Sequence, residues 1–406
     1  MNFKELWNNI LKCSVEAQEI IKPYIHITPL NHSATLSRIS NSKVFLKYEN
    51  LQKTGSFKVR GALYKISRLS SSVKGVVTAS AGNHAQGVAY AASALGLPSV
   101  VVMPESASTP KVQATKGYGA EVVLYGKVYD DAYQKALEIK DIRGYEFIHA
   151  FNDIEIIGGQ GTLGLEIINQ LGDFDIVVVP VGGGGLISGI ASTVKAKKPH
   201  VKVIGVEPES APKMLLSLKA GRPVSVEPKP SIADGLIAKK PGEISFEVVS
   251  NLVDDIVTVD EEEISQAIYM ILERKKTLVE GAGAVGVAAL ISGKINVEGK
   301  TVVIILSGGN IDLVTLNKIL IRGLIKGGRI ARISGYLPDV PGTIAKILQI
   351  IANYRGNILD ITHDRGDLKA PAWHAKITIL FETTGPEVTS AVLSKLREEG
   401  FKFTQE

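Results

Sequence analysis

Residues 175 to 186 read Asp175-Ile176-Val177-Val178-Val179-Pro180-Val181-Gly182-Gly183-Gly184-Gly185-Leu186, an apolar and largely β-branched run that ends in four glycines. A short, continuous apolar run is typical of a strand buried on both faces of a parallel sheet. Four glycines between this strand and the helical pattern that follows leave backbone N–H groups free to approach an anion. The stretch predicts a buried strand that leads into a phosphate-binding loop.

Similar apolar runs alternate with helix-length segments through most of the chain. This alternation predicts an α/β fold with doubly wound, mainly parallel sheets, whose ligands bind where strands end and loops turn into helices. The expected strands are Val44–Tyr48, Gly75–Ala79, Ser99–Met103, Glu121–Leu124, Asp175–Val181, Val201–Val206, Asp255–Val259 and Thr301–Leu306.

Length and composition are those of an ordinary soluble protein with two or three domains. The chain has 406 residues, of which 45% are hydrophobic and 21% charged, so it exceeds the size at which a single core keeps growing. The formal net charge is +5 without a dense basic run, which argues against a nucleic-acid partner. Cys13 is the only cysteine, which excludes an intramolecular disulfide framework and fits a reducing cytoplasm.

No part of the sequence favours a membrane location. Residues 1 to 21 are amphipathic and charged and lack the apolar core of a signal peptide. Gly75 to Pro104 and Ile176 to Val194 carry no charged residue, but polar residues, prolines or glycines interrupt both. We expect a cytoplasmic protein.

A lysine follows the first long strand in the stretch Lys53 to Ala62. Gly55 tightens a loop, Ser56 is a possible helix cap, and Lys58 begins a helix. The dipole at a helix N-terminus disfavours the ammonium form of a lysine, which suits a nucleophilic amine. Taken alone, Lys58 is best interpreted as a solvated surface lysine, as most lysines are, and only the rest of the chain favours the nucleophile.

Two further loops place small and polar residues at strand ends. Ser80 to Gly87 follows one strand, and its Asn83 and His84 add donors at the start of a helix. Ser307 to Asn310 follows the last strand, where Ser307 has a hydroxyl for a ligand edge. Helix capping is the alternative for both loops.

The glycine run also allows a dinucleotide site, because Glu207 follows at the end of the next strand. However, Ile187 and Ser188 stand where a strict Gly-x-Gly-x-x-Gly pattern needs its last glycine. We therefore interpret the run as a phosphate cup and keep an NAD-dependent dehydrogenase as an alternative. An amine nucleophile, a phosphate cup and a donor-rich loop together suit pyridoxal 5'-phosphate.

Five motifs in order resemble the threonine dehydratase (threonine ammonia-lyase) family, part of the tryptophan-synthase-β-like, fold type II group of pyridoxal-phosphate enzymes. They are Gly55 to Ala62, Ser80 to His84, Gly182 to Leu186, Glu280 to Ala284 and Ser307 to Asn310. The resemblance covers roughly residues 15 to 320. It implies β-elimination of L-threonine, and also of L-serine, to a 2-oxo acid and ammonia, with a serine dehydratase or racemase as the nearest alternative.

The resemblance also implies roles for individual residues. Lys58 holds the cofactor covalently and then acts as the base for the substrate Cα proton, kept neutral by cationic surroundings and partial desolvation. The cofactor-binding residues that it implies are Phe57, Lys58, Asn83, Gly182, Gly183, Gly184, Gly185, Leu186, Glu280 and Ser307, with Asn83 at the phenolic oxygen and Ser307 at the ring nitrogen. The substrate carboxylate is implied to lie at Ser80, Ala81, Gly82, Asn83 and His84.

Two departures from relatives refine this expectation. Serine racemases carry a second serine where Ala81 stands, so racemisation should be poor. Some relatives bind a divalent cation just after the strand that ends near Glu207, but Lys213 occupies the position of a second acidic ligand. We therefore expect no metal at this position. The alternative role of Glu207 is an ion pair at the surface.

The pattern changes after residue 325, where a β-α-β-β-α-β order over about 80 residues predicts a ferredoxin-like fold. Its expected elements are strands Arg329–Ser334, Asn357–His363 and Trp373–Glu382, helices to about Tyr354 and from Pro386 to about Glu399, and a short last strand. This part resembles an ACT domain, a module that binds amino acids between paired copies. The effector contacts that the resemblance implies are Asp339, Val340, Pro341, Gly342, Thr343 and Asn357.

The expected organisation is a catalytic region at 1–325, with a small lobe at about 44–150 inserted into a large lobe at 1–43 and 151–325, followed by an ACT-like domain at 326–406. The expected partners are an amino-acid substrate and an amino-acid effector, isoleucine or another, within a homodimer or homotetramer. A catalytically inactive amino-acid sensor, or a chain in which this module only drives oligomerisation, is the alternative.

Overall fold

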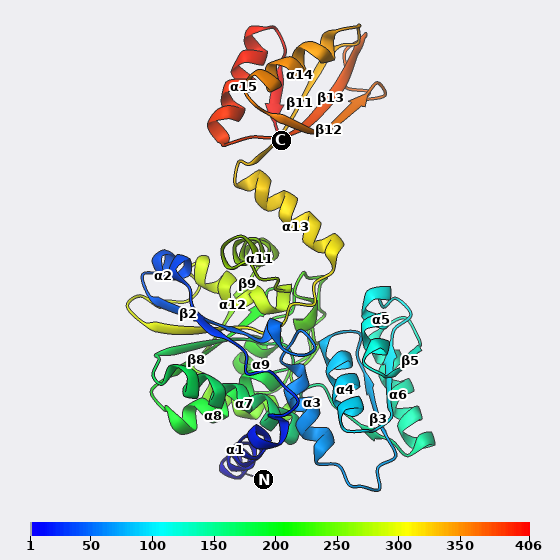
Figure 1. Ribbon diagram of the computed structural model, residues 1–406, viewed down its shortest axis with the longest axis vertical. Helices are drawn as coiled ribbons and strands as arrows, with labels where there is room; N and C mark the ends of the chain where they lie inside the picture. Colours follow the sequence, from blue (N-terminus) through cyan, green and yellow to red (C-terminus); the bar gives the residue numbers. More distant parts are fainter. Residues whose placement is uncertain (1) are drawn as a thin grey trace. The chain divides into compact units, whose positions relative to one another are not determined.

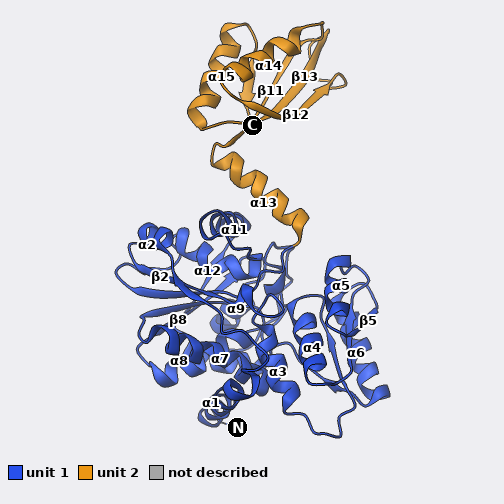
Figure 2. Ribbon diagram, viewed as in Figure 1, with its two compact units in different colours: residues 1–311 blue, residues 312–406 orange. Residues whose placement is uncertain are grey.

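The computed structural model describes residues 2–406, which divide into two compact units, residues up to Ile311 and residues 312–406 (Figure 2). The division falls before α13 (Leu313–Lys326), whereas the sequence places the boundary after this helix. The helix packs on β11 (Ile330–Pro338), the first strand of the second unit. We therefore describe α13 with the second unit.

The first unit is built on a six-stranded sheet in the order β1-β2-β10-β7-β8-β9 (Figure 1). Only the β1–β2 pair is antiparallel, and the other four pairs are parallel. The last strand along the chain, β10, lies between β2 and β7, with Tyr48 opposite Leu306. The strands are β1 (Leu30–His32), β2 (Lys43–Tyr48), β10 (Thr301–Leu306), β7 (Ile176–Pro180), β8 (Lys202–Pro208) and β9 (Asp255–Val259).

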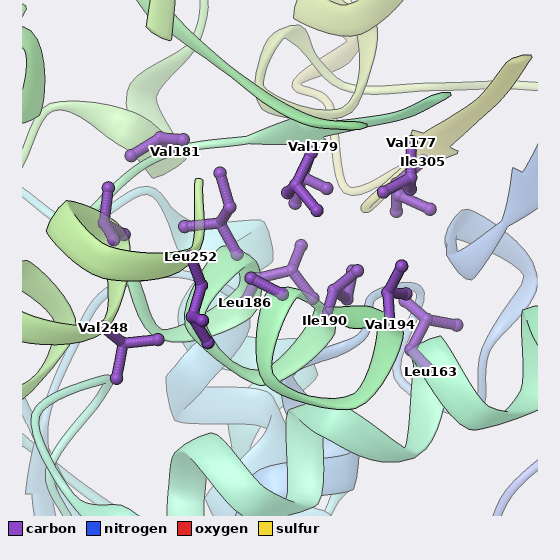
Figure 3. Packing of buried hydrophobic residues seen from close by; sticks show 14 of the residues in the cluster. Leu163, Val177, Val179, Val181, Leu186, Ile190, Val194, Val248, Leu252 and Ile305 are labelled. Carbon is purple, nitrogen blue, oxygen red and sulfur yellow. The ribbon is translucent and has the colours of Figure 1, made fainter. Parts of the chain in front are cut away.

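Helices cover both faces of this sheet, which explains the unbroken apolar runs of its strands. On one face, Val177 and Val179 of β7 pack with Ile305 of β10 against helices α7 (Ile154–Leu171) and α8 (Gly185–Lys197) (Figure 3). On the other face, β7 and β10 contact helix α12 (Gly281–Ile291). The continuous Val/Ile run of β7 thus contributes side chains to the core layers on both faces of the sheet.

A second sheet carries the small lobe, with four parallel strands in the order β5-β4-β3-β6. Its strands are β5 (Glu121–Leu124), β4 (Ser99–Met103), β3 (Val76–Ala79) and β6 (Glu146–Phe147). The lobe boundary expected at residue 44 is wrong, because β2 pairs with β10 in the large sheet. The small sheet begins only at β3.

The remaining elements of the first unit connect and cover these sheets. They are helices α1 (Phe3–Ile21), α2 (Ala34–Ser40), α3 (Lys58–Ser67), α4 (Asn83–Ala94), α5 (Thr109–Gly117), α6 (Tyr129–Arg143), α9 (Lys213–Ala220), α10 (Glu243–Leu252) and α11 (Glu261–Lys275), with short 3-10 turns η1 (Glu49–Leu51) and η2 (Asp234–Leu236).

The second unit has the predicted β-α-β-β-α-β order after α13, with an antiparallel sheet in the order β12-β13-β11-β14. Its first strand continues four residues beyond the predicted end at Ser334, because residues up to Pro338 stay paired with β13. The other elements are α14 (Thr343–Asn353), β12 (Asn357–Asp364), β13 (His374–Glu382), α15 (Pro386–Glu398) and β14 (Phe403–Gln405).

None of the helices within residues 2–406 has both the length and the apolar character that crossing a bilayer requires.

Candidate active site

Lys58 lies at the carboxyl end of β2, where the chain passes through η1 and a short loop before α3 begins. A bridge between Ser56 and Gly308 fastens this loop to the loop that follows β10. The expected cap at Ser56 is wrong: Phe57 is the N-cap residue and contributes no side-chain hydrogen bond, while Lys58 is the first helical residue. The lysine therefore sits in the first turn, where the helix dipole disfavours its charge.

A buried charge network fixes the helix that carries Lys58. Arg60, one residue beyond Val59 on α3, binds Glu49 at 2.7 Å and Glu166 at 2.9 Å, and Lys47 binds Glu166 at 2.6 Å. Because Arg60, Glu49 and Lys47 are fully buried, removing one member would leave an uncompensated charge in the core. The network holds α3 against β2 and α7.

The Lys58 amine is available as a base near neutral pH. Its Nζ donates a hydrogen bond to the carbonyl of Ala150 at 2.9 Å. Desolvation by the surrounding protein lowers the pKa of Lys58 from 10.5 to about 8, and the charge of Glu280 opposes this effect. Desolvation rather than the expected cationic surroundings is thus the cause of the shift.

A chain of hydrogen bonds joins the loops around the lysine. Asn310 donates to the Thr54 carbonyl at 2.9 Å and to the Asn83 side chain at 2.7 Å, and Asn83 donates to Glu280 at 2.6 Å. Burial, reinforced by the charge of Asp234, raises the pKa of Glu280 to about 7. Glu280 therefore changes its protonation state close to neutral pH.

The turn after β3 presents the N-terminus of α4 to the same space. The helix begins at Asn83 with Gly82 as its N-cap residue, and its first turn has no acidic side chain. Free backbone N–H groups at such an end attract a carboxylate. His84 is buried with its Nε2 engaged by the Ile148 carbonyl at 3.0 Å, and burial lowers its pKa to about 3, so the ring is neutral at physiological pH.

The glycine loop after β7 forms a close-fitting cradle at the start of α8. Gly184 has φ +98°, which side chains rarely adopt, and a Cβ there would lie 2.6 Å from the Ser245 Cβ. A Cβ on Gly183 would overlap the Phe151 ring. Packing against these neighbours therefore leaves no room for a side chain at either position, and a glycine loop at a helix N-terminus suits the phosphate of pyridoxal phosphate.

Ser307 follows β10 directly and is almost fully buried. Its hydroxyl lies 3.4 Å from the Ala282 carbonyl, a long contact that leaves it free to bond a ligand. The next helix, α13, is capped by Asp312, so the alternative role of Ser307 as a helix cap does not apply.

All the predicted cofactor and substrate residues line one cavity of about 390 Å³. Sequence reasoning missed its other wall, including Ala150, Phe151 and an ion pair of 2.7 Å between Lys111 and Asp234. No local pattern could have revealed this pair, because its two members are 123 residues apart. A cavity of this size, with a few convergent polar groups, is suited to a cofactor and a small substrate.

Glu207 lies outside this cavity lining and has a different role. Its carboxylate binds the Lys213 ammonium at 2.9 Å and accepts backbone N–H groups of Met214 and Leu215 at 3.0 and 2.9 Å. The ion pair expected at the surface is therefore buried, with both side chains fully inaccessible. Within residues 2–406, no three His, Cys, Asp or Glu side chains converge as a metal site would require.

In the second unit, the predicted effector loop lies at one end of the sheet, between Pro338 and α14. Asp339 binds Arg365 at 2.6 Å, and Gly342 is the N-cap residue of α14. Asn357 lies at the other end of the sheet, opposite Glu382, with its Nδ2 donating to that carboxylate. Within one chain, therefore, Asn357 does not meet the loop at 339–343.

Comparisons with known proteins agree with both units. Residues 21–308 match the family described as pyridoxal-phosphate dependent enzyme, and residues 333–401 match the ACT domain. The chain is 47% identical over 389 residues to an L-threonine ammonia-lyase of Thermotoga maritima. The aligned region covers 95% of this chain and 97% of that protein.

Solved structures give the same picture for the first unit. The threonine deaminase isoform 2 from Solanum lycopersicum has a TM-score of 0.74 at 38% identity, covering 77% of this chain and 87% of that one. Maize serine racemase has a TM-score of 0.72 at 37% identity, covering 78% and 98%. The fold is thus common to a protein named as a deaminase and a protein named as a racemase.

Proposed function

This chain belongs to the family of pyridoxal-phosphate-dependent enzymes and ends in an ACT domain, and from this premise we propose that it is an L-threonine ammonia-lyase. The reaction removes water from L-threonine, and hydrolysis of the resulting imine then takes up one water molecule and releases ammonia to leave 2-oxobutanoate. L-Serine gives pyruvate in the same way. The observation that carries the proposal is the cavity, which brings Lys58, the glycine cradle and the N-terminus of α4 together.

Pyridoxal phosphate supplies an electron-withdrawing ring that acidifies the Cα–H bond of a bound amino acid. Lys58 is the residue that removes this proton, because its lowered pKa of about 8 leaves a substantial neutral fraction near physiological pH. Its hydrogen bond to Ala150 holds the amine at the cavity wall. The same lysine provides the amine that holds the cofactor covalently.

The rest of the cavity positions the two small molecules. The backbone N–H groups of Gly182 to Gly185 bind the cofactor phosphate, and those at the start of α4 bind the substrate carboxylate. Ser307, which lines the cavity, would place its hydroxyl at the ring nitrogen, where a hydroxyl would hold a proton less firmly than a carboxylate. The ring would then withdraw electrons less strongly. This would favour prompt loss of the β-hydroxyl over slower reactions such as transamination or racemisation.

A racemase is the second candidate, because of the 37% identity to maize serine racemase. Racemisation needs a proton donor on each face of the substrate Cα. Lys58 serves one face, but Ala81 in the substrate-binding turn has a methyl group that can neither give nor take a proton. We therefore place elimination ahead of racemisation.

A dinucleotide-dependent dehydrogenase is disfavoured by the partners of Glu207. Such an enzyme would use this carboxylate to bind a ribose hydroxyl. Here both carboxylate oxygens already accept hydrogen bonds, from Lys213, Met214 and Leu215. Glu207 therefore has a structural role.

For the second unit, we propose that an amino acid binds at the loop of residues 339–343 and regulates the reaction. The start of α14 at Thr343 offers backbone donors, and its first turn has no acidic side chain. Asn357 would complete the site only from a second copy of the chain, so we propose a homodimer or homotetramer. The proposed location is the cytoplasm.

One preparation tests the proposal against each alternative. The purified protein should show a visible absorption band that borohydride shifts by fixing the cofactor on Lys58, and it should release ammonia and 2-oxobutanoate from L-threonine. L-Serine and O-phosphohomoserine, assayed in parallel, separate serine dehydratase and threonine synthase activities. Formation of D-serine faster than pyruvate would support the racemase instead, and binding without turnover would support a sensor.

A further inference from the structure

Lys213 is a fully buried lysine for which the proposed reaction has no use. It is the first residue of α9, and its Nζ lies within hydrogen-bond distance of four oxygen atoms. These are the Glu207 carboxylate at 2.9 Å and three backbone carbonyls, those of Val181 at 3.1 Å, Ala211 at 3.1 Å and Leu236 at 2.8 Å. The arrangement resembles a cation cage more closely than an ordinary salt bridge.

The chemistry of the four partners favours an ammonium group. Carbonyl and carboxylate oxygens only accept hydrogen bonds, and an ammonium has three N–H donors and no acceptor. Burial lowers the pKa of Lys213, while the charge and hydrogen bond of Glu207 act in the opposite direction. Since α9 also directs two backbone N–H groups at Glu207, this carboxylate remains a stable counter-ion for the lysine.

Two of the three carbonyls that Lys213 holds, those of Val181 and Leu236, belong to the two loops beside the proposed phosphate site, and the third, that of Ala211, lies just before α9. Val181 immediately precedes the glycines at 182 to 185, and Leu236 ends the turn η2, whose residues also line the cavity. A Cβ on Gly182 would lie 3.3 Å from the Gly235 carbonyl, so the two loops are in close contact. Lys213 therefore ties the phosphate cradle to the adjoining turn η2.

We propose that Lys213 is a positioning residue whose ammonium acts as an internal cation, holding the phosphate cradle and η2 together so that cofactor binding needs no free metal ion. The inference rests on the proposed role of Gly182 to Gly185 in binding the phosphate. Oxygen distances of 2.8 to 3.1 Å exceed the roughly 2.0–2.1 Å of magnesium and 2.3–2.6 Å of calcium. They are ordinary lengths for hydrogen bonds from an ammonium group, so we expect a free cation that replaces it to be monovalent and about the size of ammonium.

Two substitutions of the same residue separate the cation role from simple packing. Lys213→Ala opens a space in which a free ammonium or potassium ion can replace the tethered one. Lys213→Met removes the charge but keeps that space filled. Two quantities are measured: the affinity of the full-length protein for pyridoxal phosphate, by absorption titration, and the thermal midpoint of the holoenzyme. Both are compared at equal ionic strength in five salts, the chlorides of ammonium, potassium, sodium, magnesium and tetramethylammonium.

In tetramethylammonium chloride, both variants should lose at least about tenfold in cofactor affinity, because Glu207 is left buried without its counter-ion. Ammonium or potassium should restore the affinity and the thermal midpoint of Lys213→Ala but not those of Lys213→Met. Equal behaviour of the two variants in all five salts, or rescue by magnesium alone, contradicts the proposal.

Lys47→Met is the matched control, because Lys47 is equally buried and donates to three oxygens, of Thr28, Glu166 and Gln170, that do not line the cavity. Because Lys47 belongs to the network that holds α3, this variant should lower the thermal midpoint, and it should lower cofactor affinity by the same factor in all five salts.

The wild-type protein provides a test that does not depend on the folding of any variant. Its cofactor affinity should be the same in all five salts and in a chelator, and a cation requirement overturns the inference. A wild-type protein that binds no pyridoxal phosphate at all contradicts the proposed function instead, so the two failures are distinguishable.

Discussion

At the scale of single residues, the position of Lys58 determines its chemistry. It combines the first turn of a helix, a hydrogen bond to Ala150 and a desolvated wall. Lys58→Ala should reduce ammonia release from L-threonine by about 10²–10⁴-fold from the lost base alone, and by more because the covalent link to the cofactor is also lost. Circular dichroism should show an intact fold.

Lys65→Ala is the control for this substitution, because Lys65 is on the same helix and pairs with Asp153 and Glu155. It should keep its turnover and its absorption band. Wild-type turnover by Lys58→Ala would remove the central assignment.

Glu280 should make stability depend on pH in a predictable direction. Its pKa is about 7 in the folded protein and 4.5 without the fold, so the folded state binds the proton more tightly. The resulting stabilisation is complete below pH 4.5 and is lost as the pH rises to about 7, a change of roughly 3 kcal/mol.

Glu280→Gln cannot lose a proton, so its free energy of unfolding should lack this component. Urea unfolding of the cofactor-free proteins at pH 5 and pH 8 measures it, and the variant should gain on the wild type at the higher pH. If the free energies of unfolding of the two proteins differ by the same amount at pH 5 and pH 8, the raised pKa of Glu280 is contradicted.

Sequence reasoning reached the residues of this site that lie in local motifs and missed those that do not. Lys58 and Ser307 follow β2 and β10, adjacent strands of the large sheet, so topology brings these two to one edge, whereas Asn83 follows β3 of the small sheet. The partnership of Lys111 with Asp234 depends on two distant loops, and the burial of the Glu207–Lys213 pair depends on the packing of α9. Neither leaves a trace in local sequence.

At the scale of elements, the glycine loop offers a test of the phosphate cradle. Gly184→Ala places a Cβ 2.6 Å from Ser245 and 2.8 Å from Met214 at φ +98°, which should displace the loop and weaken the binding of pyridoxal phosphate. Fluorescence titration with the cofactor measures the effect.

Gly221→Ala is the matched control, since this glycine also has positive φ, at +65°, but a Cβ there has no neighbour within 4 Å. It should cost about 1–2 kcal/mol of stability and leave cofactor affinity unchanged. Equal affinities for the two variants would exclude the cradle as the phosphate site.

The elements themselves were predictable to the extent that burial shaped their sequence. Strands covered on both faces, such as Ser99–Met103 and Thr301–Leu306, are continuous apolar runs, and their predicted bounds are confirmed. The strands that were not predicted are β1, with three residues, and β6, with two. Such short segments carry no periodicity, and only pairing with a neighbour makes them strands.

At the scale of the whole molecule, regulation can be separated from catalysis by changing the second unit alone. Gly342 caps α14 with φ +90°, and a Cβ there meets no neighbour. Gly342→Ala should therefore strain the effector loop and reduce the response of activity to an added amino acid such as L-isoleucine, while activity without effector stays unchanged.

Gly400→Ala provides the comparison within the same unit, because Gly400 has φ +86° and equally open surroundings. It should show similar backbone strain but a normal response to the added amino acid. The response is measured as the change in the rate of ammonia release when the amino acid is added. Identical responses of both variants would place the effector elsewhere.

The central place of β10 in the large sheet has a consequence for synthesis of the protein. On the ribosome, Lys58 is made early, but β2 has only the short β1 beside it until residues 301–306 arrive to pair between β2 and β7. Ser307 and Asn310, which line the cofactor cavity, are translated immediately after β10. A nascent chain should therefore be unable to capture its cofactor until almost the entire first unit has left the exit tunnel.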